Sequence, residues 1–301
     1  MQKKQLRNLN IEFTYITQLV NVNVIFPSSS RDTEEGNLFN KNKVNKKRYK
    51  TIILSDLHLG TSTSKAKEVN HFLKHHKCET LILNGDIIDG WQLKKSGEWK
   101  KQHTKFFKLV LKRASKGTKI IYIRGNHDDF LDEVLPFTMG NFSIRLEYYL
   151  QSGNKKYYVV HGDIFDMVTT KLKWLAKLGD VSYTFLLWLN KHYNKRRERR
   201  GQPYYSLSQV IKAKVKSAVS FISDFETQLA SVAKKKNCDG VICGHIHTPA
   251  NKMIGDIHYL NSGDWVESLT ALVETFEGEW KIIHYTEWLN ELKMQLSYDL
   301  W

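Results

Sequence analysis

Cysteine is scarce in this chain, and its scarcity excludes a disulfide-stapled fold. The 301 residues include three cysteines, Cys78, Cys238 and Cys243, and none of them forms a CxxC pair. Small extracellular domains that depend on disulfides carry many more cysteines at closer spacing. We therefore expect free thiols and a reducing cytosol.

Long apolar runs are also missing. No stretch of about 18 apolar residues occurs, which excludes a conventional membrane-spanning helix. Residues 1–26 open with basic residues and then become mildly apolar, but Gln18, Asn21 and Asn23 interrupt the apolar part. No small-residue cleavage site follows, so we expect neither a signal peptide nor a membrane anchor here.

Positive charge, in contrast, is abundant. The formal net charge is +15, and such a surface attracts anions: nucleic acid, an acidic membrane face or a phosphorylated substrate. A hydrophobic content of 41% over 301 residues is enough for one large domain with a smaller appendage.

Composition divides the chain into three parts. Residues 1–48 contain a serine triplet and a Lys/Asn-rich stretch, so we expect a flexible N-terminal extension, with a surface-binding arm as the alternative. Residues 49–290 form the predicted main domain, and residues 291–301 a C-terminal tail.

The main domain begins with apolar strands separated by helices. Strands are predicted at residues 51–54, 80–84 and 119–124, with helices at residues 65–76 and 101–116 between them. This alternation indicates parallel βαβ units. Two further strands are predicted at residues 156–160 and 239–243. The strands at residues 257–260, 270–276 and 280–285 are expected to form a second sheet of hairpins packed on the first.

Each of five strands ends in residues that can bind a metal ion. The candidate ligands are Asp56, His58, Asp86, Asn126, His161, His245 and His247. The carboxyl ends of strands are where open α/β sheets place their sites. A lone histidine is more often structural, but five such blocks in one chain favour a metal centre. Seven ligands suffice for two divalent ions if one carboxylate bridges them. Gly85, Gly125, Gly162 and Gly244 are expected to let the chain turn sharply after the strands.

The blocks DLH, GDIID, GNHD, HGD and GHIH, in this order, resemble the five blocks of calcineurin-like metallophosphoesterases across residues 49–285. The resemblance implies an α/β (α+β) fold, a two-sheet β sandwich flanked by helices (αββα). It also implies that Asp56, His58 and His247 hold one metal ion. Asn126, His161 and His245 would hold the second, and Asp86 would bridge the two.

The same resemblance implies the chemistry. Two divalent ions, most simply Mn²⁺ with Fe or Zn²⁺ as alternatives, bind phosphate oxygens and lower the pKa of a shared water, which attacks phosphorus in line. His127 would stabilise the transition state or protonate the leaving oxygen, and Asp89 would orient His127. The alternative for Asp89 is a cap of its loop.

Residues 165–236 form a predicted helical cap insertion, dense in apolar and aromatic residues and with a basic run at residues 195–200. The insertion resembles the bacterial branch that includes UDP-2,3-diacylglucosamine diphosphatase, which gives UMP and a lipid sugar phosphate. A lipid-linked nucleotide substrate would then contact Asn126 and His127, with Asp166, Trp188 and Arg199 from the insertion. The acidic face of the inner membrane would attract the basic run, so we expect a cytoplasmic protein peripheral to that membrane.

One residue departs from that branch, and other functions stay open. The branch carries arginine after the asparagine of GNHD, where this chain has His127. The aromatic residues of the insertion would, in the alternative, only hold helices together. A phosphodiesterase or nuclease is a second hypothesis, although apolar clusters suit acyl chains better than stacked bases. A non-catalytic scaffold is the third, and the complete ligand set argues against it. The oligomeric state stays open.

Overall fold

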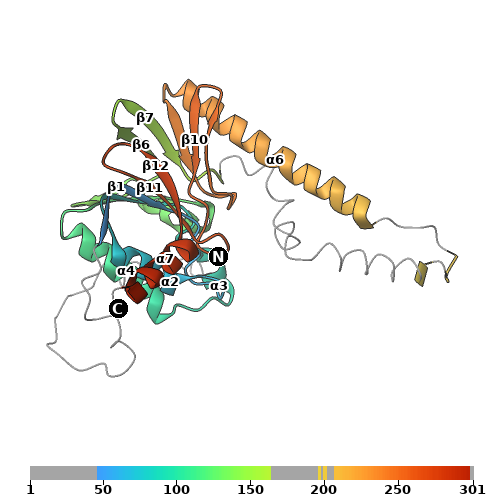
Figure 1. Cartoon of the computed structure of the whole chain (residues 1–301), viewed down its shortest axis with the longest axis horizontal. Helices are drawn as coiled ribbons and strands as arrows, with labels where there is room; N and C mark the ends of the chain where they lie inside the picture. The colour runs from blue at the N-terminus through green and yellow to red at the C-terminus, as the bar shows by residue number, and fades with distance from the viewer. Residues whose placement is uncertain (1–45, 164–195, 198, 202–206, 299–301) are drawn as a thin grey trace, which may run out of the picture. The chain divides into compact units, whose positions relative to one another are not determined.

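Parallel strands and intervening helices build a seven-stranded mixed sheet. A computed structural model describes residues 46–163, 196–197, 199–201 and 207–298 (Figure 1). The strand order of the first sheet is β12-β11-β1-β2-β3-β5-β4. Its strands are β1 (Lys47–Leu54), β2 (His76–Asn84), β3 (Lys119–Ile123), β4 (Phe137–Met139), β5 (Phe142–Arg145), β11 (Thr270–Glu274) and β12 (Trp280–His284). Because β1, β2 and β3 run parallel, their C-terminal ends meet at one edge.

A second sheet of five strands lies against the first, in the order β6-β7-β8-β10-β9. Its strands are β6 (Glu147–Ser152), β7 (Lys155–Val160), β8 (Gly240–Cys243), β9 (Ala250–Ile254) and β10 (Ile257–Asn261). The parallel pairing of β7 with β8 brings a second pair of C-terminal ends together. Five candidate ligand blocks therefore follow strands of the two sheets, three from the first sheet and two from the second.

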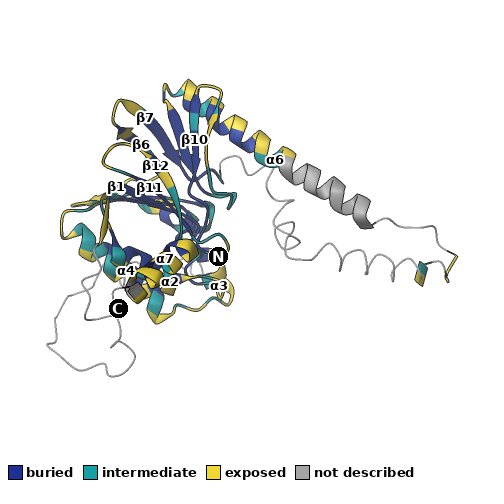
Figure 2. Cartoon of the chain, in the orientation of Figure 1, coloured by how far each residue is buried: buried dark blue, intermediate teal, exposed yellow. Residues whose placement is uncertain are grey.

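The hydrophobic core lies between the sheets. Ile53 and Ile82 of the first sheet share a buried cluster with Val159, Ile242 and Leu260 of the second. Figure 2 shows much of both sheets in the dark blue of buried residues. Removing this apolar surface from water is the main force that holds the sheets together, at about 25 cal/mol for each Å² buried.

Helices cover the outer faces of both sheets. Helices α2 (Ala66–His75) and α4 (Lys101–Ala114) contact β2 and β3 of the first sheet, and α6 (Leu207–Lys235) contacts β8 and β10 of the second. The remaining helices are α3 (Gly90–Lys95), η1 (Asn126–Val134) and α7 (Tyr285–Tyr298). The predicted α/β two-sheet sandwich with flanking helices is confirmed.

The prediction for the last two strands was wrong. The hairpin of β11 and β12 extends the first sheet, where β11 pairs antiparallel with β1 and Ile53 lies opposite Leu272. Buried Glu274 fixes this position, because its carboxylate accepts hydrogen bonds from Thr51 (2.5 Å) and Ser152 (2.6 Å). An apolar strand pattern carries no information about which sheet the strand joins.

Two predicted segments also include residues that pack in the core. The predicted insertion, residues 165–236, includes the C-terminal half of α6, where Phe225, Leu229 and Ala233 pack on the second sheet. The predicted tail at residues 291–301 includes part of α7, in which Leu292 is buried. Among the helices that the structure describes, none is long and apolar enough to cross a membrane.

Candidate metal centre

Five of the seven candidate ligands adopt a left-handed backbone. Their φ angles are 53° for Asp56, 44° for His58, 52° for Asp86, 68° for His245 and 54° for His247. Residues other than glycine rarely adopt positive φ, since the conformation costs free energy and persists only where the surroundings enforce it. Such a concentration of strained residues at the strand ends indicates a functional site.

Backbone hydrogen bonds hold these strained loops against one another. The N–H of Asp56 donates to Gly85 O (3.0 Å), and the N–H of His58 donates to Asp86 O (2.9 Å). The carbonyl oxygen of Asp56 in turn accepts from the N–H of Trp265 (3.1 Å). The loops after β1 and β2 are thus joined, and the segment before β11 supports them.

The four glycines of the blocks serve two different purposes. Gly85 and Gly162 adopt positive φ, 80° and 121°, as expected for sharp turns. Gly125 and Gly244 do not, which corrects the expectation for these two. A Cβ atom at Gly244 would lie 2.6 Å from Asp56 Oδ2, and one at Gly125 would lie 2.4 Å from Asp86 N. Both positions therefore require glycine for close approach to a candidate ligand.

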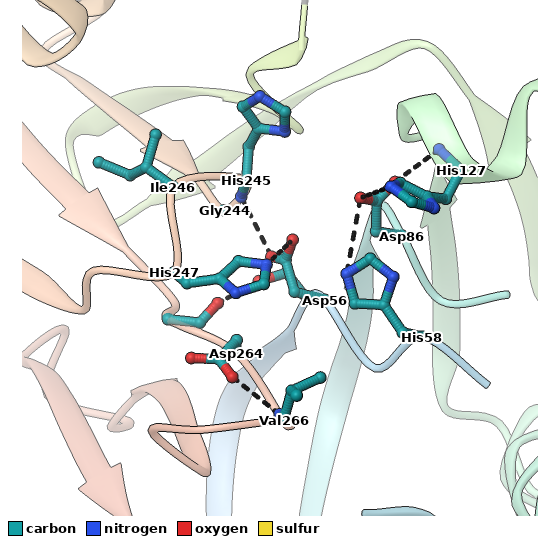
Figure 3. Close-up of polar contacts among 12 residues, drawn as sticks. Asp56, His58, Asp86, His127, Gly244, His245, Ile246, His247, Asp264 and Val266 are labelled. Atoms are coloured by element: carbon teal, nitrogen blue, oxygen red, sulfur yellow. Dashed lines mark hydrogen bonds and ion pairs between the residues drawn. The ribbon is translucent and has the colours of Figure 1, made fainter. Parts of the chain in front are cut away.

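The first cluster consists of Asp56, His58 and His247, whose ligand atoms lie within 4.8 Å of one another (Figure 3). His247 Nε2 is 3.2 Å from Asp56 Oδ1. The other carboxylate oxygen, Oδ2, accepts a hydrogen bond from the N–H of His245 (3.1 Å). Asp56, in the first ligand block, therefore contacts His245 and His247 of the last block, almost 200 residues later in the sequence.

The second cluster consists of Asp86, His161 and His245, again within 4.8 Å. His161 is fully buried, and its Nδ1 lies 2.8 Å from the carbonyl oxygen of Asn84, which fixes the proton on Nδ1. Its Nε2 is then available as a ligand atom and lies 3.4 Å from Asp86 Oδ1.

Asp86 lies between the two clusters. Its Oδ2 is 3.8 Å from His58 Nε2 in the first cluster, and its Oδ1 is 3.4 Å from His161 Nε2 in the second. Oδ1 also accepts a hydrogen bond from the N–H of His127 (2.9 Å), which Figure 3 shows. One oxygen toward each cluster is the arrangement that a bridging carboxylate requires.

Asp89 contacts two imidazoles with a single oxygen. Its Oδ2 lies 3.0 Å from His127 Nδ1 and 3.3 Å from His58 Nδ1. The other oxygen, Oδ1, accepts from the N–H of Gln92 (2.8 Å) and caps α3. The two interpretations of Asp89, an orienting group and a loop cap, therefore describe different oxygens of the same side chain.

Charge is distributed so that the site favours cations. Burial raises the pKa of Asp56, but His247 and His161 outweigh it and hold that pKa at about 2. Burial likewise opposes a charge on His161, yet Asp86 and Asp56 raise its pKa to about 10. Burial also opposes a charge on His247, and Asp56 raises its pKa to about 9. The negative field that favours a proton on these rings also favours a divalent cation.

Buried polar atoms that make no hydrogen bond indicate whether metal ions fit this site. Asp56 Oδ1, Asn126 Oδ1 and His161 Nε2 are buried and make no hydrogen bond, although His247 Nε2 lies 3.2 Å from the first atom and Asp86 Oδ1 lies 3.4 Å from the last. A buried polar atom without a partner costs about 1–3 kcal/mol, so native proteins rarely contain several together. All three atoms are of ligand type and all belong to the candidate set. The donor set of carboxylate, amide and imidazole groups therefore fits divalent metal ions.

Some predicted site residues lie apart from this centre. Asp166 and Trp188 fall outside the described residues. Arg199 lies in an exposed turn, and within the described part of the chain no contact joins it to the ligands.

Asn126, by contrast, lies beside the centre. It starts η1 directly after Gly125, which packs against Asp86 and the ring of His161.

Two residues near the centre were not predicted from the sequence. Buried Asp128 accepts hydrogen bonds from the N–H groups of Ile87 (3.1 Å) and Ile88 (2.8 Å), so it anchors the loop that carries Asp86. Trp91 packs against His127 in a tilted arrangement, with ring centroids 4.3 Å apart. Asp128 ends the GNHD block, and Trp91 is two positions after the end of GDIID. Position beside these blocks was the available signal for both.

The fold and the site together define a class. Two ligand clusters with one carboxylate between them, at the strand ends of an αββα sandwich, are the features of a hydrolase with a dimetal centre. The family description "calcineurin-like phosphoesterase" matches residues 49–249, more than half of the chain. The chain belongs to the calcineurin-like phosphoesterase family, and it is accordingly a hydrolase that acts on phosphoester bonds.

Several solved structures resemble the chain at low sequence identity. A predicted phosphoesterase from Streptococcus pneumoniae is 14% identical, with 78% of this chain and 97% of that chain covered and a TM-score of 0.34. An archaeal phosphodiesterase is 15% identical, with 77% and 98% covered and a TM-score of 0.37. Yfce, a phosphoesterase from E. coli, is 13% identical, with 78% and 98% covered and a TM-score of 0.35. No curated protein matches the chain in sequence.

Proposed function

We propose that the chain hydrolyses a lipid-linked nucleoside diphosphate, UDP-2,3-diacylglucosamine or a close relative, to UMP and a lipid sugar phosphate. The observation that carries this proposal is where the insertion begins and returns. It begins at residue 165, four positions after His161 in the sequence, and it returns through α6, whose Phe225 ring centroid lies 6.3 Å from that of His245. A Cβ atom at Gly162 would lie 2.9 Å from the same Phe225 ring. The insertion is thus rooted beside two candidate ligands.

The sequence of the insertion suits a substrate with acyl chains. Residues 172–189 contain two tryptophans and a majority of apolar side chains, and residues 195–200 contain five basic side chains. An apolar segment rooted at a phosphoesterase centre supports binding of acyl groups next to the scissile bond. The basic run supports attraction to an acidic membrane surface, where such a substrate resides, and so a peripheral position on the inner membrane.

The chain's own groups divide the work of hydrolysis. Asp56, His58 and His247 would hold one divalent ion, and Asn126, His161 and His245 a second, with Asp86 shared. Bound divalent ions polarise phosphoryl oxygens and acidify water, and Mn²⁺ is the ion we propose. His127, as the imidazolium, would donate the Nε2 proton to the leaving oxygen and become neutral, and the Asp89 carboxylate, 3.0 Å from Nδ1, would stabilise the charged form.

Incubation of the purified protein with Mn²⁺ and UDP-2,3-diacylglucosamine tests the proposal through release of UMP. We expect UMP from the acylated substrate and little from UDP-N-acetylglucosamine, which lacks the acyl chains. A variant in which residues 166–205 are replaced by a short linker should keep hydrolysis of bis(p-nitrophenyl) phosphate and lose the lipid substrate. Equal turnover of both sugar nucleotides, or equal loss of both activities in the variant, would contradict the assignment.

A phosphodiesterase acting on nucleic acid is the second candidate, and the net charge of +15 is the observation that favours it. Binding that depends on phosphate contacts weakens steeply with salt. Hydrolysis of single-stranded DNA or RNA that falls steeply between 50 and 200 mM salt (on the order of 10³-fold for several phosphate contacts), with no UMP release from the lipid substrate, would favour this alternative.

A further inference from the structure

Trp91 is an exposed aromatic side chain fixed beside the proton-donating histidine. Its indole lies over the imidazole of His127, with centroids 4.3 Å apart and an angle of 36° between the rings. The indole N–H donates to Asp129 Oδ2 (2.9 Å). In spite of both contacts, 40% of the residue is exposed. Part of the indole surface is therefore open to a ligand next to His127.

The local backbone explains why the indole is held there. Helix α3 begins directly after Asp89, whose Oδ1 caps it at Gln92, so Trp91 follows the orienting carboxylate by two residues. Gly90 brings α3 close to η1, since a Cβ atom at this position would lie 2.7 Å from the ring of Phe130. The close approach and the bond to Asp129 restrict the indole, so little conformational entropy is lost when a ligand binds to it.

If Trp91 only stabilised the fold, the exposure of its side chain would have no explanation. Trp265, Trp280 and Trp288, by contrast, are buried. A large aromatic side chain gains most from full burial, and enrichment of exposed, rigid aromatics is typical of recognition surfaces. Trp91 has a fixed ring and an open surface, and the ring it packs against is that of His127 beside the candidate metal centre.

We propose that Trp91 is a substrate-contact residue that stacks on a flat ring of the phosphoester, a nucleobase or an aryl group, beside His127. The inference rests on the proposed function, because it requires a phosphoester bound at the metal centre within reach of His127. Every nucleobase and aryl group has a π face, and stacking on an indole discriminates these rings from small aliphatic groups without further hydrogen bonds.

Competitive inhibition by product-like phosphates tests this role. Inhibition constants of inorganic phosphate, methyl phosphate, phenyl phosphate and UMP are measured against bis(p-nitrophenyl) phosphate with Mn²⁺ present. The wild-type protein should bind phenyl phosphate and UMP about tenfold more tightly than methyl phosphate. Trp91→Leu should remove this preference and leave the inhibition constant of inorganic phosphate unchanged, whereas Trp91→Phe should keep part of the preference.

A control variant and two contrary outcomes complete the test. Phe276→Leu changes a similarly exposed aromatic residue that follows β11 at the end of the sheet opposite to Asp56, and it should preserve the ring preference. An unchanged preference in Trp91→Leu, or an equal loss of affinity for all four phosphates, would overturn the role of Trp91. Absence of any phosphoester turnover by the wild-type protein would instead overturn the proposed function.

Discussion

Asp89 places one carboxylate oxygen 3.0 Å from Nδ1 of His127, and the same oxygen lies 3.3 Å from Nδ1 of His58. One side chain therefore orients a candidate metal ligand and the proposed proton donor together. A hydrogen bond at Nδ1 fixes the tautomer and leaves Nε2 of each ring for its own task. Metal binding at the first cluster and proton donation by His127 are thereby linked through one carboxylate.

Asp89→Asn should weaken both functions at once. The amide keeps an oxygen that can cap α3, but it loses the negative charge that both imidazoles share. Loss of such an outer partner of a metal ligand costs about 10–100-fold in metal affinity or activity. We expect a decrease of that size in kcat together with weaker binding of one of two Mn²⁺ ions, measured by kinetics and by calorimetric titration.

Asp132→Asn is the matched control, because this half-exposed carboxylate pairs with Arg124 (2.7 Å) and belongs to neither ligand cluster. It should leave both Mn²⁺ affinities unchanged. If Asp89→Asn lowered kcat while both affinities stayed at the wild-type level, the link to His58 would be wrong.

Asp86→Ala should abolish metal-dependent hydrolysis. This carboxylate directs one oxygen toward each ligand cluster, so its removal weakens both metal sites. The loss should exceed about 100-fold, the upper end of what the removal of an outer partner of a metal ligand costs. Calorimetry should show fewer than two bound Mn²⁺ ions. Asp86→Asn keeps an acceptor for the N–H of His127. If this variant loses as much activity as Asp86→Ala while its melting temperature is unchanged, the loss is due to the missing negative charge.

Stability without metal ions should fall as the pH rises above neutrality. The pKa of His161 is raised from 6.5 to about 10 and that of His247 from 6.5 to about 9. Their contribution to stability is complete below pH 6.5 and is lost as the pH rises through 9 to 10. Asp56, with its pKa lowered from 3.8 to about 2, adds stability above pH 3.8 that is lost as the pH falls toward 2. The plateau should therefore lie between these limits.

Mn²⁺ should reverse the alkaline part of this profile, because a metal ion binds the neutral imidazole and displaces the protons. Melting temperatures at pH 6, 7.5 and 9, in EDTA and in Mn²⁺, check both statements. A melting temperature in EDTA that stays level or rises between pH 6 and 9 would refute the assignment of protons to His161 and His247.

The ligand blocks are predictable from the sequence because their position follows from local rules. A buried strand followed by Asp, His or Asn is visible in one short window, and parallel strands bring such ends together. For this reason the sequence alone selects Asp56, Asp86 and His161. They follow β1 and β2 of the first sheet and β7 of the second, and the packing of the two sheets brings His161 to 3.4 Å from Asp86. The shared role of Asp89 is not visible in the sequence, because the 3.3 Å contact with His58 depends on how two loops meet.

Long-range packing explains the wrong sheet assignment of β11 and the contacts of α6 that the sequence did not predict. The choice of sheet for β11 depends on its pairing with β1, more than 200 residues earlier, and on the buried carboxylate of Glu274. The C-terminal half of α6 has the same apolar spacing in a cap as in a core helix, so its contacts with β8 and β10 could not be predicted. Periodicity identifies the buried face of an element but not the partner that buries it.

Two glycines separate the role of close approach from that of backbone strain. Gly244 lacks positive φ, and a Cβ atom there would lie 2.6 Å from both Asp56 Oδ2 and Ser55 Oγ. Gly278, in the turn before β12, has a φ of 85° and no atom within 4 Å of an added Cβ. Gly244→Ala should displace Asp56 and lower kcat/KM by about 100-fold, as expected for a shift of about 1 Å at a reacting centre.

Gly278→Ala should have the opposite profile. An L-residue with a left-handed backbone costs about 1–2 kcal/mol, so the melting temperature should fall while kcat/KM and Mn²⁺ affinity stay at the wild-type level. The two variants are compared by thermal unfolding and by hydrolysis of bis(p-nitrophenyl) phosphate with excess Mn²⁺. Wild-type activity in Gly244→Ala would show that Asp56 tolerates displacement, and the first ligand cluster would then not be required for hydrolysis.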